Sequence, residues 1–190
     1  MNRTAKFLRK TGETEIDVEL NLDGVGKSQI DTSIKFMDHM LVLLAKHSNI
    51  DLNLKATGDL THHIIEDIGI VLGESFQKAL GDKKGINRYG SALIPMDETL
   101  ARCVLDFGGR KTLIMDLTLN ECEIEDVAVE DIKHFFNSFA ENAKMNLHLH
   151  VLYGKDQHHK VEAVFKALAR AINQAKQIIS EEIPSTKGTL

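Results

Sequence analysis

Histidine and glutamate residues recur in two short clusters of the sequence that share one spacing. Each cluster reads His-His-x-x-Glu, at residues 62–66 and 158–162, and each opens a stretch with the apolar periodicity of an amphipathic helix. A further histidine precedes each cluster, His39 by 23 residues and His134 by 24. Residues three or four apart are neighbours on a helix, so each cluster would bring imidazole rings and a carboxylate together. These groups form a ligand set for divalent first-row metal ions.

Adjacent histidines on a helix project about 100° apart, so His62 and His63 are not expected to bind the same ion. One ring would face a site in its own subunit while its neighbour serves another site, and each site could draw ligands from both halves of the sequence or from different chains. Four mixed ligands leave two positions open on an octahedral ion such as Mn²⁺, which favours a catalytic over a structural site. The eight candidate ligands are His39, His62, His63, Glu66, His134, His158, His159 and Glu162.

The same residues also have a plainer interpretation. A single His-His-x-x-Glu motif is more often polar helix surface than a metal site, and the second copy at matched spacing is what favours metal binding. His148 and His150 alternate along a strand-like segment and are predicted to be structural or surface residues. His47 follows His39 on the same predicted helix and is a candidate for supporting the site.

Composition restricts the class of protein. The chain has 190 residues, of which 43% are hydrophobic and 27% charged, as in ordinary globular proteins. The formal net charge of −5 argues against a general nucleic-acid or membrane-surface binder, and an anionic ligand would need a locally basic pocket. The two cysteines do not form a C-x-x-C pair, so neither a disulfide framework nor a zinc ribbon is expected. No apolar run approaches the roughly 20 residues of a membrane span, and we expect a cytoplasmic protein.

The two clusters belong to a longer internal repeat. Shifting the second cluster back by 96 residues places Glu162 on Glu66 and Gly154 on Gly58, and a shift of 95 places His134 on His39. The apolar positions of the two long helices coincide under the same shift. The sequence therefore predicts a duplicated protein, with repeats at about residues 1–87 and 88–180, that forms one domain over residues 1–190 with a shared core.

Each repeat is predicted to run strand, strand, helix, strand, helix. The first repeat has strands at 15–22, 27–32 and 51–56 and helices at 36–47 and 62–80; the second has strand segments at 91–106, 111–119 and 146–152 and helices at 131–144 and 158–179. We expect an α+β fold whose sheets are covered by helices on one face. The polar tail at 183–190 would by itself be a frayed terminus.

Eight short motifs occur in an order that resembles a known family. They are R-K-T-G-E-T at 9–14, D-H-M-L at 38–41, H-H-I-I-E-D at 62–67, R-Y-G at 88–90, P-M-D-E-T-L at 95–100, G-G-R at 108–110, H-H-K-V-E-A-V-F-K-A at 158–167 and S-T-K-G at 185–188. Each motif alone is weak, but the ordered series is specific. The sequence resembles the imidazoleglycerol-phosphate dehydratases of histidine biosynthesis over essentially its whole length.

The resemblance implies a carbon–oxygen lyase, or hydro-lyase, that converts D-erythro-imidazole glycerol phosphate to imidazole acetol phosphate and water, with two Mn²⁺ per active site. It implies the same eight metal ligands and a proton-transferring Glu13; an assisting role for His47 is a separate hypothesis. It also implies that the tail contributes to the active site and that the chain forms a homo-oligomer of twenty-four subunits with sites at their interfaces. The implied phosphate contacts are Arg88, Arg110, Lys166, Ser185 and Lys187.

Some positions depart from the family pattern. Leu43 replaces a glutamine, Asp156 an asparagine and Phe107 a serine, and the short segment between Asp59 and His62 lacks an aspartate-rich lead-in. We therefore expect the first histidine pair to be supported differently. A metal-binding cage or storage protein without catalysis is the alternative; it would explain the ligands but not the R-Y-G, G-G-R and S-T-K-G motifs. A dinuclear metallohydrolase would show more aspartates.

Overall fold

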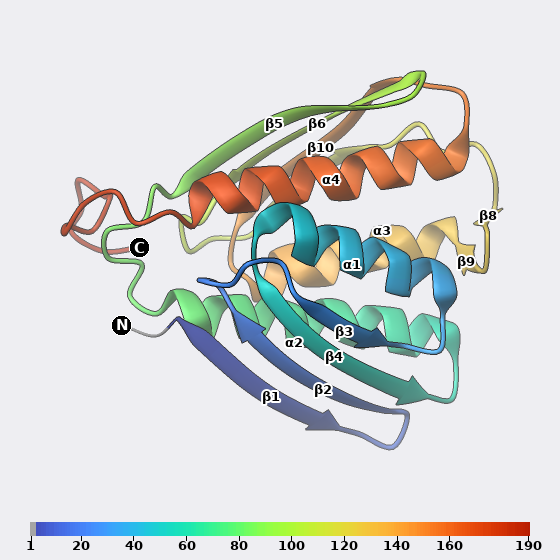
Figure 1. The fold of residues 1–190 in the computed structure, drawn as a ribbon, viewed down its shortest axis with the longest axis horizontal. Helices are drawn as coiled ribbons and strands as arrows, with labels where there is room; N and C mark the ends of the chain where they lie inside the picture. Colours follow the sequence, from blue (N-terminus) through green and yellow to red (C-terminus); the bar gives the residue numbers. More distant parts are fainter. Residues whose placement is uncertain (1–2) are drawn as a thin grey trace.

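Two four-stranded sheets enclose a double layer of helices in the computed structural model, which describes residues 3–190 (Figure 1). The first repeat contributes β1 (Thr4–Lys10), β2 (Thr14–Asn21), β3 (Ser28–Asp31), α1 (Lys35–Ser48), β4 (Asp51–Gly58) and α2 (Thr61–Leu80). The second contributes β5 (Tyr89–Met96), β6 (Thr99–Asp106), β7 (Thr112–Asp116), β8 (Glu123–Ile124), β9 (Val127–Ala128), α3 (Val129–Asn142), β10 (Asn146–Tyr153) and α4 (Gln157–Ala175).

The two large sheets share one topology. Their strand orders are β1-β2-β4-β3 and β5-β6-β10-β7, and in each the first three strands are antiparallel while the last is parallel to its neighbour. The α+β class and the internal duplication predicted from the sequence are confirmed. The small β8–β9 hairpin occurs, among the residues described, only in the second repeat.

The large sheet of each repeat has one strand more than the sequence pattern indicated, and the β8–β9 hairpin was not predicted. β1 was not predicted, because this edge strand mixes charged residues with its few apolar ones and Ala5 alone is fully buried. Residues 91–106 were predicted as one segment and form the β5–β6 hairpin. α4 ends at Ala175 and not at 179, because the chain beyond it pairs with the segment that leads into β5: Asn87 N donates to Gln177 O and Ile179 N to Gly85 O.

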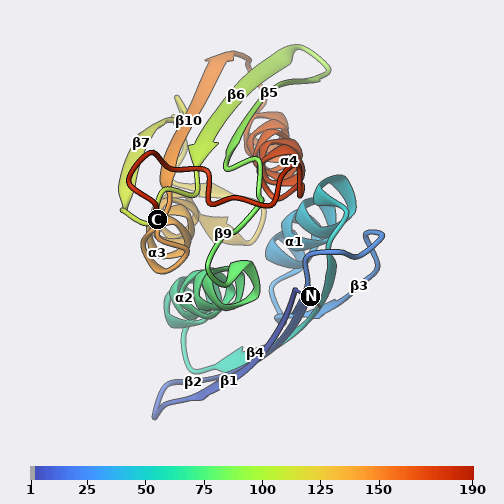
Figure 2. The same cartoon turned by 90° about the vertical axis from the view of Figure 1, so that its left-hand side faces the viewer.

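The helices form the two inner layers. α1 and α2 lie on the first sheet, α3 and α4 on the second, and the layers meet where α2 packs on α3 and α1 on α4 (Figures 1 and 2). α2 is therefore covered on both sides, with Ile65, Ile68, Leu72 and Phe76 fully buried. Burial of each such side chain contributes about 1.5–3 kcal/mol. No helix of residues 3–190 is long and apolar enough to span a membrane.

All four helices begin at the same end of the molecule (Figure 1). A buried lysine fixes the opposite end: Lys176, which follows α4, donates from Nζ to the carbonyl oxygens of Leu22 and of Asn49, the residue that ends α1. The ends of α1 and α4 are thus joined across the repeats. Consequently the beginnings of helices from both repeats lie side by side.

Two glycines allow α2 and α3 to approach closely. A Cβ atom at Gly69 would lie 2.8 Å from Phe135 O, and one at Gly73 would lie 2.8 Å from Ala143 N and 2.9 Å from Phe139 O. These are backbone atoms of α3 and of the residue after it, so no side-chain movement would relieve the contact. The absence of side chains at these two positions sets the distance between the helices.

We expect Gly73→Ala to destabilise the protein. Alanine favours the helix by up to about 1 kcal/mol, but the added methyl group must push two backbones apart, so a net loss of about 2 kcal/mol in the free energy of unfolding is expected. Urea unfolding of metal-free protein measures the change. Gly12→Ala is the matched control, because a Cβ there meets nothing within 4 Å. A Gly73→Ala variant as stable as the wild type would contradict this account of the helix contact.

Candidate metal centre

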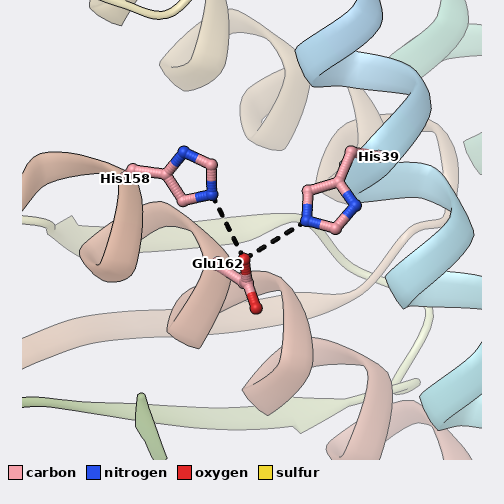
Figure 3. Close-up of side chains that lie close together, drawn as sticks. All are labelled: His39, His158 and Glu162. Carbon is pink, nitrogen blue, oxygen red and sulfur yellow. Dashed lines mark hydrogen bonds and ion pairs between the residues drawn. The ribbon is translucent and has the colours of Figure 1, made fainter. Parts of the chain in front are cut away.

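The contact between α1 and α4 brings three candidate ligands together. His39 Nε2 lies 3.2 Å and His158 Nε2 3.3 Å from the same Glu162 oxygen, Oε2 (Figure 3). All three ligand atoms lie within 4.8 Å of one another. Protein ligand atoms bind such an ion at about 2.0–2.2 Å. Two neighbouring ligands of one ion are therefore separated by distances like the 3.2 and 3.3 Å seen between these atoms. These residues, which we call cluster A, therefore fit a divalent metal ion.

Glu162 of cluster A is held as a carboxylate. Its side chain is almost completely buried, which opposes ionisation, but the Lys166 ammonium, with the two histidines beside it, outweighs burial and holds its pKa below the usual value. The Lys166 ammonium lies 2.5 Å from the second oxygen, Oε1. Oε2 therefore keeps its negative charge on the side that faces the two histidines.

The contact between α2 and α3 brings together a matching set, His62, Glu66 and His134, which we call cluster B. His62 Nε2 is 3.8 Å from Glu66 Oε2, and the rings of His62 and His134 are 4.9 Å apart between centroids. Cluster B has the same composition as cluster A, two imidazoles and one carboxylate, in a more open arrangement. Among the described residues, only cluster A has three such ligand atoms within 4.8 Å of one another.

Both clusters are assembled across the repeats. The sequence grouped His39 with the histidine pair of its own repeat, but the structure places it with His158 of the second repeat, and His134 with His62 of the first. The reason is that helices of different repeats pack together. This arrangement agrees with the expectation that each site draws on both halves of the sequence.

The second histidine of each pair turns away from its neighbour. Nδ1 of His63 lies 2.8 Å from Asp59 Oδ1, and Nδ1 of His159 lies 2.8 Å from Glu98 Oε2. These hydrogen bonds raise the pKa of both histidines. Within residues 3–190, no hydrogen bond occupies Nε2 of either ring. Both rings are partly exposed, so each could bind an ion held mainly by another chain.

Four carboxylates that the sequence pattern did not single out hold the Nδ1 atoms of the paired histidines. Hydrogen bonds of this kind fix the tautomer in which Nε2 is free to bind a metal. The histidine Nδ1 atoms donate to these carboxylates: His62 to Asp131 at 2.6 Å, His158 to Glu125 at 3.0 Å, His63 to Asp59 and His159 to Glu98. Asp59 could have been found, because it lies just before α2 and only four residues before His63; the others are distant in sequence from the histidines they contact.

The sequence predicted that the first histidine pair would be supported differently, and the structure shows which residues support it. Asp131 and Asp59 support its two rings in spite of the short lead-in. At the position that matches Asp131 in the first repeat stands Phe36, whose ring packs 5.1 Å from His158. Phe36 has no acceptor, and Glu125 of the β8–β9 hairpin supplies one instead.

The other departures have structural roles. Asp156 caps α4, since its Oδ1 accepts a hydrogen bond from His159 N at 3.0 Å. Phe107 is fully buried, and Leu43 packs against the hydrophobic core.

Most of the predicted phosphate contacts lie at the end of the molecule where the helices finish, opposite both clusters. Arg88 N donates to Ala175 O in the last turn of α4, whereas His158 stands in its first turn. At 1.5 Å per residue the helix separates them by about 25 Å. Lys166, by contrast, is beside cluster A, and His47 is near it: burial, then the charges of Lys166 and Arg170, lower the pKa of His47.

The C-terminal tail folds back over the end of the molecule that holds Arg88 and the last turn of α4 (Figure 2). Arg88 donates to both oxygens of Asp106, at 2.6 and 3.0 Å, and its Nη1 donates to Pro184 O at 2.8 Å. A Cβ atom at Gly109 would lie 2.9 Å from the backbone of Leu190. The tail, with Ser185 and Lys187, therefore runs beside the Gly-Gly-Arg turn that ends in Arg110.

Comparisons with known proteins agree with this geometry. The family model described as imidazoleglycerol-phosphate dehydratase matches residues 32–172. Relatives of that name from Chlorobium phaeobacteroides (52% identical, covering 99% of this chain and 96% of theirs) and Methanococcoides burtonii (53%, 99% and 100%) match throughout. The crystal structure of the Pyrococcus furiosus enzyme is similar with a TM-score of 0.86 at 37% identity, covering 97% of this chain and all of that one. The Staphylococcus aureus structure gives 0.85 at 36%, covering 92% and 99%.

The Asp131–His62 hydrogen bond leads to a test of cluster B. In Asp131→Asn the shape is kept and the charge that favours the metal-binding tautomer is lost, so affinity for Mn²⁺ should fall about 10–100-fold at one site. Isothermal titration calorimetry of the metal-stripped protein with Mn²⁺ measures this affinity. Glu130→Gln, the exposed neighbour that pairs with Lys133, is the control and should bind as the wild type does. Unchanged affinity in Asp131→Asn would mean that Asp131 does not support a metal ligand.

Proposed function

The chain belongs to the imidazoleglycerol-phosphate dehydratase family, and on that premise we propose that it removes water from D-erythro-imidazole glycerol phosphate to give imidazole acetol phosphate in histidine biosynthesis. The activity is that of a carbon–oxygen lyase. The single observation that supports it best is the convergence of His39, His158 and Glu162, with a matching second cluster, at one end of the helices. A cytoplasmic location stays a prediction.

We propose that the ions are Mn²⁺, two per active site. Clusters A and B would each provide three ligands, and His63 and His159 of other chains would complete the two sets. When bound, the ions act as Lewis acids that stabilise negative charge on the imidazole ring of the substrate. The residues of the chain itself hold the reactants and move the protons.

Glu13 is the proposed proton carrier. Its side chain is 61% exposed, and its nearest charged neighbour is Nδ1 of His63, 3.9 Å from Oε2. It therefore stands beside a proposed metal ligand and is free to take a proton from carbon and to return one. His47 would assist, because its lowered pKa keeps the imidazole neutral and able to accept a proton near neutral pH.

The phosphate group would be held by polar and basic residues, all but Lys166 at the tail end. Guanidinium groups bind phosphate through paired N–H donors, and Arg88 keeps N–H groups beyond the three that Asp106 and Pro184 use. The proposed contacts are Arg88, Arg110, Lys166, Ser185 and Lys187. They give a protein of net charge −5 the local positive charge that a phosphate ester requires.

The separation within one chain supports an active site shared between chains. The substrate has only a glycerol chain between its imidazole ring and its phosphate, and it cannot reach over the roughly 25 Å from cluster A to Arg88 of the same chain. We therefore propose a homo-oligomer in which metal ligands of one chain meet phosphate contacts of another, in an assembly of twenty-four subunits.

A metal-storage cage is the alternative function. It would use the clusters but gives no role to the tail that Arg88 and Gly109 hold against the second end of the chain. Metal binding alone does not distinguish the two functions, whereas turnover does.

Turnover should depend on metal. Metal-stripped protein is expected to convert imidazole glycerol phosphate only after Mn²⁺ is added, with formation of the ketone product as the readout. The restored rate should exceed the metal-free rate by at least about 100-fold, since removal of a catalytic ion abolishes the stabilisation it provides. Mn²⁺ bound at two sites per chain without any turnover would favour the storage cage.

Mixed oligomers test the shared site. His63→Ala and Arg110→Ala chains should each be inactive alone, because one lacks a metal ligand and the other a phosphate contact. Co-assembled in equal amounts, they should recover about a quarter of the wild-type activity, because a random mixture gives that share of sites two intact contributors. A mixture as inactive as its parents would show that both residues serve a site within one chain.

A further inference from the structure

We propose that Glu98 is a positioning residue that fixes His159 for metal binding and does not carry protons, so that the two repeats have given their equivalent glutamates different tasks. This inference rests on the proposed function, because it assigns a role at the same site. It follows from three observations: the equivalence of two hairpin turns, the contacts of the two glutamates, and one substitution between the repeats.

The turns that hold Glu13 and Glu98 are equivalent. Glu13 ends the β1–β2 turn directly before Thr14, and Glu98 ends the β5–β6 turn directly before Thr99. Both threonines are buried. A glycine matched by the repeat packs against each turn: a Cβ atom at Gly58 would lie 2.8 Å from Glu13 O, and one at Gly154 would lie 2.9 Å from Thr99 Cβ. Each glutamate thus stands beside the second histidine of its own repeat.

Glu98 uses both carboxylate oxygens. Oε1 accepts hydrogen bonds from the backbone N–H groups of Lys155 and Asp156, each at 2.9 Å, and from Thr99 Oγ1 at 3.1 Å. Oε2 accepts the bond from His159 Nδ1 at 2.8 Å. A carboxylate that accepts four hydrogen bonds in this way has a fixed position.

Glu13 has the opposite surroundings. Within residues 3–190 its carboxylate accepts no hydrogen bond, and 61% of its side chain is exposed. His63, which it faces, already has its Nδ1 held by Asp59 at 2.8 Å. Glu13 is therefore not needed to orient a ligand and can move between positions as a proton carrier must.

One substitution between the repeats explains the difference. The shift of 96 residues that aligns Gly154 with Gly58 places Lys155 on Asp59. A lysine side chain has no acceptor, so the second repeat has no counterpart of the Asp59–His63 bond. Glu98 supplies the missing acceptor, so its carboxylate is fixed, whereas the carboxylate of Glu13 can still move. The bond leaves Nε2 of His159 as the metal-binding atom.

Substitution of each glutamate by glutamine separates the two roles. Glutamine has one acceptor oxygen, so at position 98 it can serve either the backbone N–H groups or His159, but not both. For Glu98→Gln we expect Mn²⁺ affinity to fall about 10–100-fold at one site, while kcat at saturating Mn²⁺ stays within a few-fold of wild type. For Glu13→Gln we expect unchanged Mn²⁺ affinity and a loss of about 10²–10⁴ in kcat. Titration calorimetry of the metal-stripped oligomer and steady-state kinetics measure the two quantities.

A rescue and a control complete the experiment. Adding Lys155→Asp to Glu98→Gln recreates the arrangement of Asp59 and His63, and it should restore most of the lost Mn²⁺ affinity. A general loss of structure would not respond to this change. Glu15→Gln, an exposed residue of β2 that pairs with Lys10, should leave both affinity and kcat unchanged. Glu98→Asp, which keeps the charge but withdraws from His159, serves as the second variant if Glu98→Gln does not fold.

Two results for Glu98→Gln would contradict the proposal. If Glu98→Gln binds Mn²⁺ normally and loses kcat as Glu13→Gln does, Glu98 is a proton carrier; if neither quantity changes, it has no role at the site. Failure of the proposed function is distinguishable, because it would appear as wild-type protein that binds Mn²⁺ but does not turn over imidazole glycerol phosphate. The effect of Glu98 on Mn²⁺ affinity can be measured in either case.

Discussion

The contact of helices across the two repeats is the constraint on which the rest of the structure depends. α1 packs on α4 and α2 on α3, with all four helices beginning at one end. Because each contact joins a histidine of one repeat to a histidine and a glutamate of the other, neither repeat alone could build a cluster of three ligands. Gly69 and Gly73 set one helix distance, and Lys176 ties the far ends of the other pair. Packing far from the clusters therefore determines their geometry.

The sequence predicted the parts better than their assembly. Spacing gave eight candidate ligands and predicted the duplicated α+β plan, because helix periodicity and repeats are local properties. It grouped His39 with His62, because the pairing of helices is a property of the packed core and leaves no mark in local spacing. Asp131 and Glu125 were missed for the same reason, since they reach His62 and His158 only in the fold. β1 was missed because an edge strand with several charges lacks the alternation of a central one.

The distance between the two clusters and Arg88 has consequences for function. A helix of nineteen residues separates the clusters from the arginine and the tail at the other end. The same parallel arrangement that gathers the candidate metal ligands thus removes them from most of the proposed phosphate contacts. On the proposed function, a single chain would hold two incomplete halves of a site. Association of chains is the simplest way for such a molecule to bring a cation centre and a phosphate pocket together.

Duplication supplied two copies of every part, and the differences between the copies show how the site became asymmetric. Phe36 stands where Asp131 would be expected and Lys155 where Asp59 would be, so the second histidine pair lacks both supports of the first. Glu125 and Glu98 supply acceptors in their place. Glu125 comes from the β8–β9 hairpin of the second repeat, whereas Glu98 is the twin of a residue that remains free. Since one free carboxylate beside one proposed metal ligand suffices for proton transfer, the loss of symmetry need not weaken catalysis: a fixed acceptor orients one histidine, and its mobile twin is left to carry protons.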